Sequence, residues 1–241
     1  MKRFCALLLL LSLLPLFPFP AKAGSDHAIK RVECDEKLIA LTFDDGPHPQ
    51  YTEEILDILK EYGQKATFFV VGQNAKEHPE ILCRAVREGH EIGEHTYSHG
   101  YINRMSDEQL ISDMEKTEAA IREACGVTPL LIRPPGGGYN DHTLRIIEER
   151  GKLCVLWNRD TRDWQLPSVQ TVLSRLEGNL TAGDIILFHD YNRKNSPTPD
   201  ILRQLIPHML EQGYRFVTVT ELLNSKKATQ SDDCAAALFT A

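Results

Sequence analysis

Two short segments carry side chains of the types that bind metal ions and activate water. Residues 42–47 read TFDDGP and place adjacent carboxylates, Asp44 and Asp45, at the end of an apolar run. Residues 95–99 read HTYSH and hold His95 and His99 four positions apart, so that one helical turn or a tight loop can bring both imidazoles to one point. Two histidines and one carboxylate form a three-ligand site that leaves a zinc position open for water. The spare aspartate can then act as a base, so the pattern predicts metal-assisted hydrolysis.

Both segments also have a purely structural interpretation. Asp-Gly-Pro is a good turn sequence, and a histidine pair of this spacing also occurs at exposed or core positions. If a strand continues through Asp44 and Asp45, their side chains point to opposite sides, so that one can bind metal while the other faces water. His90-Glu91 resembles the start of a helical metalloprotease motif, but Glu94 stands where that motif needs histidine. His90 is therefore interpreted as structural.

Three later segments could complete a catalytic site. Residues 133–139 read RPPGGGY, in which Arg133 could orient a carboxylate and the glycines let backbone N–H groups approach a ligand. A rigid turn is the alternative, and the spacing excludes a phosphate loop. Residues 157–164 read WNRDTRDW, and Trp164 could form an apolar wall for a sugar ring. His189 follows an apolar run, where its pKa can be tuned near neutrality for a general acid.

Apolar runs alternate with amphipathic segments along residues 30–225, which predicts a parallel sheet with helical crossovers. The expected strands are Leu38–Phe43, Ala66–Val71, Glu91–Gly93, Pro129–Ile132, Leu153–Leu156, Ile185–Phe188 and Phe216–Val219. The expected helices are Thr52–Glu61, Lys76–Arg87, Asp107–Ala124, His142–Glu149, Val169–Gly178 and Asp200–Glu211. About seven such units favour an α/β fold closed into a (β/α) barrel, with its active site at the carboxyl ends of the strands.

Several polar residues fit helix caps. Ser106 with Gln109 forms a capping box, and three later positions are candidate N-caps. These positions are Asn140 or Asp141, Ser168 and Thr198. Pro207 interrupts the last expected helix and can kink it.

Composition limits the cellular setting and the partners. Residues 1–23 have a basic start, a leucine-rich run and an Ala-Lys-Ala ending, which predicts a cleaved signal peptide, with a retained membrane anchor as the alternative. Three of the 27 basic residues lie in this stretch, so 24 basic residues face 34 acidic ones, a net charge of about −10. That balance argues against nucleic acid as a partner. Five cysteines remain, and the sequence assigns no disulfide among Cys34, Cys83, Cys125, Cys154 and Cys234.

Taken together, the segments resemble the polysaccharide deacetylases of the NodB-homology type, the family 4 carbohydrate esterases. Five family motifs occur in order across residues 36–223: TFDDGP, HTYSH, RPPGG, DTRDW and LFH. The resemblance implies a distorted (β/α) barrel in a single domain with one divalent metal ion, zinc first, and cobalt or manganese as alternatives. It further implies an enzyme that acts on an N-acetylated polysaccharide or oligosaccharide. Together with the signal-peptide pattern, we expect a secreted or cell-envelope protein, and we expect a monomer.

The resemblance also implies roles for single residues. It makes Asp45, His95 and His99 the metal ligands. Asp44 is then the catalytic base, oriented by Arg133, and His189 is the catalytic acid, supported by Asp163. Trp164 forms the hydrophobic wall, and Gly136 donates a backbone N–H to the oxyanion. Two positions depart from the family pattern. Glu94 stands where asparagine is frequent, and Gly136 stands where an aromatic residue is common, so that an aromatic contact to substrate is lost there.

The expected organisation is a signal peptide at 1–23, an N-terminal segment at 24–35, a deacetylase domain at 36–223 and a disordered tail at 224–241. The expected activity is removal of N-acetyl groups from amino-sugar polymers, either peptidoglycan or chitin-like oligosaccharides, with release of acetate. One alternative is an O-acetyl esterase on xylan or a related glycan. A more distant alternative is a carbohydrate-binding protein that has lost turnover.

Overall fold

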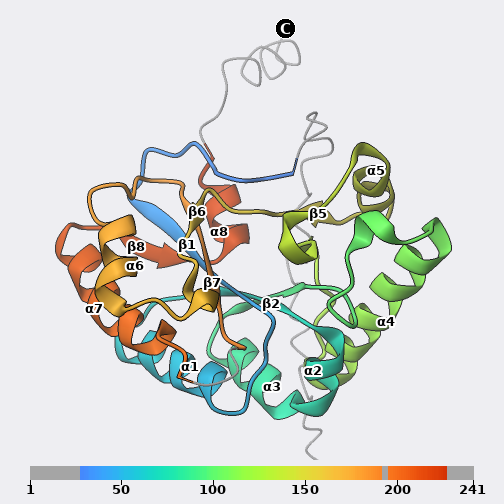
Figure 1. Ribbon diagram of the computed structural model, residues 1–241, viewed down its shortest axis with the longest axis horizontal. Coiled ribbons are helices and arrows are strands. Elements are labelled where there is room, and N and C mark those ends of the chain that lie inside the picture. Colours follow the sequence, from blue (N-terminus) through green and yellow to red (C-terminus); the bar gives the residue numbers. More distant parts are fainter. Residues whose placement is uncertain (1–27, 192–194, 227–241) are drawn as a thin grey trace, which may run out of the picture.

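The computed structural model describes residues 28–191 and 195–226. The expected signal peptide at 1–23 and nearly all of the expected tail lie outside these residues. Eight strands form one parallel sheet: β1 (Leu38–Asp44), β2 (Thr67–Val70), β3 (Glu91–Glu94), β4 (Leu131–Ile132), β5 (Leu153–Cys154), β6 (Arg159–Asp160), β7 (Ile185–His189) and β8 (Arg215–Val217). Apart from the last helix, which lies beside β1, the helices form an arc outside the strands (Figure 1). The helices are α1 (Tyr51–Glu61), α2 (Gly72–Glu77), α3 (Pro79–Arg87), α4 (Asp107–Cys125), α5 (Asp141–Glu149), α6 (Val169–Leu176), α7 (Thr198–Glu211) and α8 (Val219–Asn224).

The sheet order is β5-β4-β3-β2-β1-β7-β6, and β8 pairs with the first half of β1. The expected distorted (β/α) barrel is confirmed, with the sheet curled and no direct pairing between β5 and β6 among the described residues. The segment before β1 lies near this gap, since Ile29 bridges to Val155 and Arg31 bridges to Asp184. These contacts join residues 28–32 to the sheet rather than leaving them as a separate extension.

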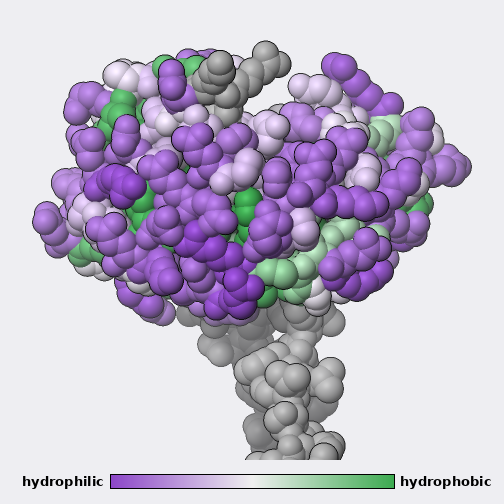
Figure 2. Space-filling model, turned by 90° about the horizontal axis from the view of Figure 1, so that it is seen from below, coloured by the Kyte–Doolittle hydropathy of each residue, from purple (hydrophilic) through white to green (hydrophobic). Residues whose placement is uncertain are grey.

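The central strand is buried along its whole length. All seven residues of β1 are buried, as a parallel strand covered on both faces requires. Outside the sheet, the helices bury one side and leave polar side chains at the surface. On the face shown in Figure 2, hydrophilic residues predominate and hydrophobic ones form small groups between them. The described residues contain no helix that is long and apolar enough to cross a bilayer.

Most of the expected elements are present, with local differences. The expected helix Lys76–Arg87 is wrong as one element, because His78 leaves helical geometry and Pro79 starts a new helix. Thr198 is not a cap, because it is already the first residue of α7 and its hydroxyl donates to Asp163. The expected strand Phe216–Val219 is too long, since Thr218 caps α8 and ends the strand.

Two further elements were not expected, β6 within the tryptophan-rich segment and α8 after the last strand. The capping box at Ser106 and the cap at Ser168 are confirmed. Of the two candidates Asn140 and Asp141, Asn140 is the N-cap of α5, and it forms a capping box with Thr143. Pro207 lies inside α7 as expected.

The strand register brings the candidate residues to one edge. Asp44 pairs with His189 across β1 and β7, and Glu94 pairs with Ile132 across β3 and β4. His95 and Arg133 follow those last two residues, so they lie side by side just beyond the strands. The carboxyl ends of four strands thus carry the base, acid, ligand and arginine candidates, as expected for a barrel site.

Candidate active site

The two aspartates of the TFDDGP segment converge instead of pointing apart. Strand β1 ends at Asp44, and Asp45 takes a left-handed backbone conformation with φ of 80°. The chain therefore turns between them, and both carboxylates approach His95 Nε2, at 3.8 Å for Asp44 and 3.3 Å for Asp45. The expectation that the two side chains point to opposite sides is therefore wrong, because the strand ends at Asp44 and does not continue through Asp45.

One carboxylate and two imidazoles form a compact cluster. Asp45 Oδ1 lies 3.3 Å from His95 Nε2 and 3.1 Å from His99 Nε2. This oxygen is buried and has no hydrogen-bond partner among the described residues. His95 Nδ1 lies 2.7 Å from the carbonyl oxygen of Arg133, which can only accept, so Nδ1 carries the proton and Nε2 keeps its lone pair. The donor set and the orphaned oxygen fit a divalent cation.

The charges in this cluster depend on one another. Burial by itself raises the pKa of the Asp45 carboxyl, but the imidazoles of His95 and His99 outweigh burial and lower it below its usual range. In return, the close contact with the Asp45 carboxylate raises the pKa of His99. Protons and a metal ion therefore compete for the same atoms, so acidic pH weakens metal binding at this site.

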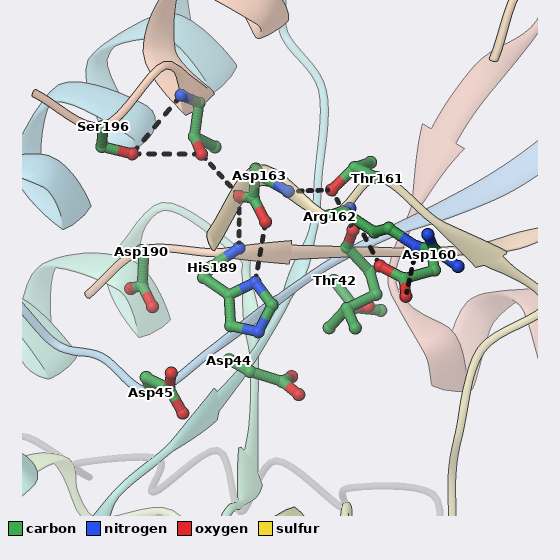
Figure 3. Close-up of polar contacts among 12 residues, drawn as sticks. Thr42, Asp44, Asp45, Asp160, Thr161, Arg162, Asp163, His189, Asp190 and Ser196 are labelled. Carbon is green, nitrogen blue, oxygen red and sulfur yellow. Dashed lines mark hydrogen bonds and ion pairs between the residues drawn. The ribbon is translucent and has the colours of Figure 1, made fainter. Parts of the chain in front are cut away.

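A second pair, formed by Asp163 and His189, lies at the end of the neighbouring strand β7. Asp163 Oδ1 accepts a 2.7 Å hydrogen bond from His189 Nδ1, and Asp163 Oδ2 accepts from the His189 backbone N–H at 2.8 Å. The hydroxyl of Thr198 donates to the same Oδ2 at 2.6 Å. Burial lowers the pKa of His189, but Asp163 outweighs that effect and raises it to about 9. Figure 3 shows Asp163 on one side of the imidazole, with Asp44 and Asp45 on the other.

Arg133 holds the first aspartate in place. Its side chain is fully buried, and Nη1 donates at 2.8 Å both to Asp44 Oδ1 and to Thr42 Oγ1. Nη2 and Nε donate to the carbonyl oxygens of Leu156 and Val155. A guanidinium fixed at four acceptors can orient the Asp44 carboxylate without rotating. The arginine also supplies the carbonyl that sets the His95 tautomer, so it acts on both the ligand and the base candidate.

Two further candidates lie at the rim of the site. Gly136 is in the short helix η2 (Pro135–Gly137), with φ of 62°, a conformation that favours glycine. Trp164 is in the short helix η3 (Asp163–Gln165) and is 54% exposed. Asp163, which precedes it in the same turn, is fully buried and binds His189. The proposed contacts of Gly136 and Trp164 with substrate stay predictions.

The sequence interpretation missed Asp190. Its buried carboxylate accepts from the Gly46 backbone N–H at 2.9 Å and from the Thr52 hydroxyl at 2.6 Å, so it holds the turn that carries Asp45. Burial raises the pKa of Asp190 to about 7. Its position next to His189 at a strand end was the available signal, but the partners lie about 140 residues earlier in the chain.

The other polar residues near the histidines have structural partners. Glu94 is buried and pairs with Lys152 at 2.7 Å. The hydrogen bond between His95 Nδ1 and the carbonyl oxygen of Arg133 is therefore intact, although Glu94 stands where the family often has asparagine. His90 is buried and accepts from the backbone N–H of Ala66 at 3.2 Å, in line with its structural interpretation. No disulfide occurs among the described cysteines, and Cys234 lies outside the described residues.

Comparison with known proteins places this site in a family. The family described as polysaccharide deacetylase matches residues 31–155. A peptidoglycan-N-acetylglucosamine deacetylase of Bacillus cereus is 42% identical over 201 residues, covering 81% of this chain and 92% of that protein. Other relatives are longer, and the chain spans 42% of the length of one of them.

Solved structures agree with this assignment. The crystal structure of the Bc1960 peptidoglycan N-acetylglucosamine deacetylase superposes with a TM-score of 0.79 at 34% identity, covering 84% of this chain and 95% of that one. A family 4 acetyl xylan esterase from Clostridium thermocellum, in complex with a cobalt ion, superposes with a TM-score of 0.72 at 36% identity. It covers 78% of this chain and 91% of that one. Sequence, fold and strand-end geometry agree, and the chain belongs to the polysaccharide deacetylase family.

Proposed function

We propose that this chain is an exported, metal-dependent hydrolase that removes N-acetyl groups from amino-sugar polymers and releases acetate. The observation that carries the proposal is a buried carboxylate, Asp44, beside a three-residue metal cluster and next to an imidazole whose pKa is raised to about 9. A base, a cation site and an acid at one strand edge are the groups that amide hydrolysis requires. Peptidoglycan is the first substrate to test, because the B. cereus relative bears that name.

Each group has a distinct task in this proposal. Asp45, His95 and His99 hold the divalent ion, zinc first, with cobalt or manganese as alternatives. Bound there, such an ion polarises the acetyl carbonyl and makes water more acidic. Asp44 takes the proton from the attacking water, and Arg133 holds that carboxylate in a fixed orientation. The backbone N–H of Gly136 donates to the oxyanion, and Trp164 lines the sugar.

The acid explains why an amide is the preferred substrate. A sugar alkoxide can depart from an ester with little help, whereas nitrogen leaves an amide only after it has received a proton. His189, charged at neutral pH through Asp163, supplies that proton at Nε2 while Nδ1 stays bound to the carboxylate. This pairing favours N-deacetylation over the O-acetyl esterase alternative, which the acetyl xylan esterase among the similar structures keeps open.

Acetate release decides among the alternatives. The metal-loaded protein is incubated in parallel with peptidoglycan, chitin oligosaccharides and acetylated xylan. Released acetate is quantified, and the masses of the glycans are measured by mass spectrometry. Loss of one acetyl unit per amino sugar supports the proposal. Acetate from xylan alone would make the protein an esterase. No acetate from any glycan, with binding intact, would favour the carbohydrate-binding alternative. An Asp44→Asn variant serves as the matched blank.

The setting of this activity is also proposed. Residues 1–23 direct export, and the catalytic domain spans residues 36–223, with residues 28–32 of the preceding segment joined to its sheet. The enzyme then acts as a monomer outside the cell or in its envelope. Sequencing the amino terminus of the exported protein tests cleavage after Ala23.

A further inference from the structure

The glycine-rich loop after β4 is in contact with another loop. A Cβ built on Gly136 would lie 3.3 Å from Cε1 of Tyr101, and one on Gly138 would lie 3.3 Å from the Asn103 side chain. These distances are tighter than ordinary contacts, so the missing side chains make room for the loop of residues 100–105. Fully buried Ile102, in the short helix η1 (Ile102–Arg104), anchors that loop.

Tyr101 is held in place and yet remains open to solvent. Its side chain is 48% exposed, although its neighbour Ile102 is fully buried. The guanidinium of Arg104 lies 4.9 Å from the ring centroid, and Gly136 lies against the ring edge. A tyrosine restrained in this way can accept a ligand at a low cost in conformational entropy.

Exposed hydrophobic side chains gather near the site. Four of the five large ones among the described residues lie within three residues of a candidate metal, acid or support residue, and they are Tyr101, Trp164, Leu166 and Tyr191. The fifth, Leu130, precedes β4 and so lies at the opposite end of the strands. A surface groove of about 530 Å³ runs beside the same loop and is lined in part by Tyr97, Ser98 and Met105. Aromatic groups concentrated at the rim of a site indicate ligand contact.

We propose that Tyr101 is a substrate-binding residue whose ring packs against a sugar ring on the Gly136 side of the site. It takes the space that the missing side chain of Gly136 leaves, so an aromatic contact reaches this side from a different loop. Trp164 follows β6, beyond β1 and β7 in the sheet, and lines the other side. The ligand is the acetylated amino-sugar chain, and in this respect the inference rests on the proposed function.

Steady-state kinetics on a soluble N-acetylglucosamine tetramer and on solubilised peptidoglycan test the inference. Tyr101→Ala is expected to raise KM roughly three- to tenfold, as the loss of one well-placed aromatic contact predicts, with kcat changed less than about twofold. Tyr101→Leu, which keeps apolar bulk against Gly136 but has no flat ring, is expected to raise KM similarly. Tyr101→Phe, which keeps the flat ring, is expected to raise KM less than Tyr101→Leu does. The exposed control Leu130→Ala is expected to match the parent protein.

Metal content and the melting temperature are measured for every variant. A Tyr101→Leu variant with normal KM would overturn the inference, as would losses confined to kcat and accompanied by metal loss. If the parent protein releases no acetate from any glycan, the proposed function fails instead. An active parent with an unaffected Tyr101→Leu variant refutes the role of Tyr101 alone.

Discussion

Removing the carboxylate beside the acid should shift the pH profile in one direction. The pKa of His189 rises from an ordinary 6.5 to about 9, although burial alone pushes it below 6.5. At 1.36 kcal/mol per pKa unit, the shift corresponds to about 3 kcal/mol in favour of the charged imidazole. Asp163→Asn should therefore lower the alkaline limb of the activity profile by about two pH units or more. At pH 8 a shift of two units lowers the protonated fraction, and with it the rate, roughly tenfold.

The assay is kcat/KM against pH on one soluble acetylated oligosaccharide. Both proteins carry the same metal, whose charge affects His189 alike in each. Thr198→Val is the matched control, because it removes a hydrogen bond to Asp163 but leaves the carboxylate charge. The alkaline limb of this variant should stay within about half a pH unit of the parent's. The acid limb should not move in either variant. An alkaline limb that stays put or rises in Asp163→Asn would refute the electrostatic account of the acid.

The same pair should contribute to stability. Because the folded state raises the pKa of His189, its pairing with Asp163 stabilises the fold fully below pH 6.5, and this contribution is lost as pH rises through 9. Denaturant unfolding of the parent and Asp163→Asn at pH 6 and pH 10 measures it. The free-energy gap between the two proteins should narrow at the higher pH, and a gap independent of pH would contradict the pKa shift.

Three further outcomes follow from the site. His95→Ala and His99→Ala should each lose stoichiometric metal in elemental analysis, whereas His142→Ala, which changes an exposed histidine paired with Asp107, should keep it; full metal in both ligand variants would refute the cluster. Asp44→Asn should keep its metal and lose about 10²-fold or more in rate, so that loss of metal would show the two aspartates to be misassigned. Replacing Asp190 by alanine leaves two buried donors unpaired and should cost about 1–3 kcal/mol in the free energy of unfolding, measured with denaturant.

Local patterns were sufficient for most of the architecture. Apolar runs and capping residues such as Ser106 predict strands and helices, because burial periodicity and helix-end hydrogen bonds are short-range properties. The alternation of strands and helices also predicts a parallel barrel, in which the carboxyl ends of all strands lie at one face and carry the active site. The candidate residues could therefore be named in advance, from Asp44 at the end of β1 to His189 at the end of β7.

Long-range contacts decided the geometry. The left-handed turn at Asp45 depends on Asp190, far along the chain, and this turn makes both aspartates face His95. The tautomer of His95 is set by the carbonyl oxygen of Arg133, just after the next strand, and no local pattern contains this contact.

The loop contact at the rim was decided in the same way. The family resemblance implied that an aromatic contact is lost at Gly136, and only the folded chain shows the ring of Tyr101 next to that glycine. Residue type is a local property of the chain, but distance, burial and proton affinity depend on which strands and loops pack together, and that packing exists only in the tertiary structure.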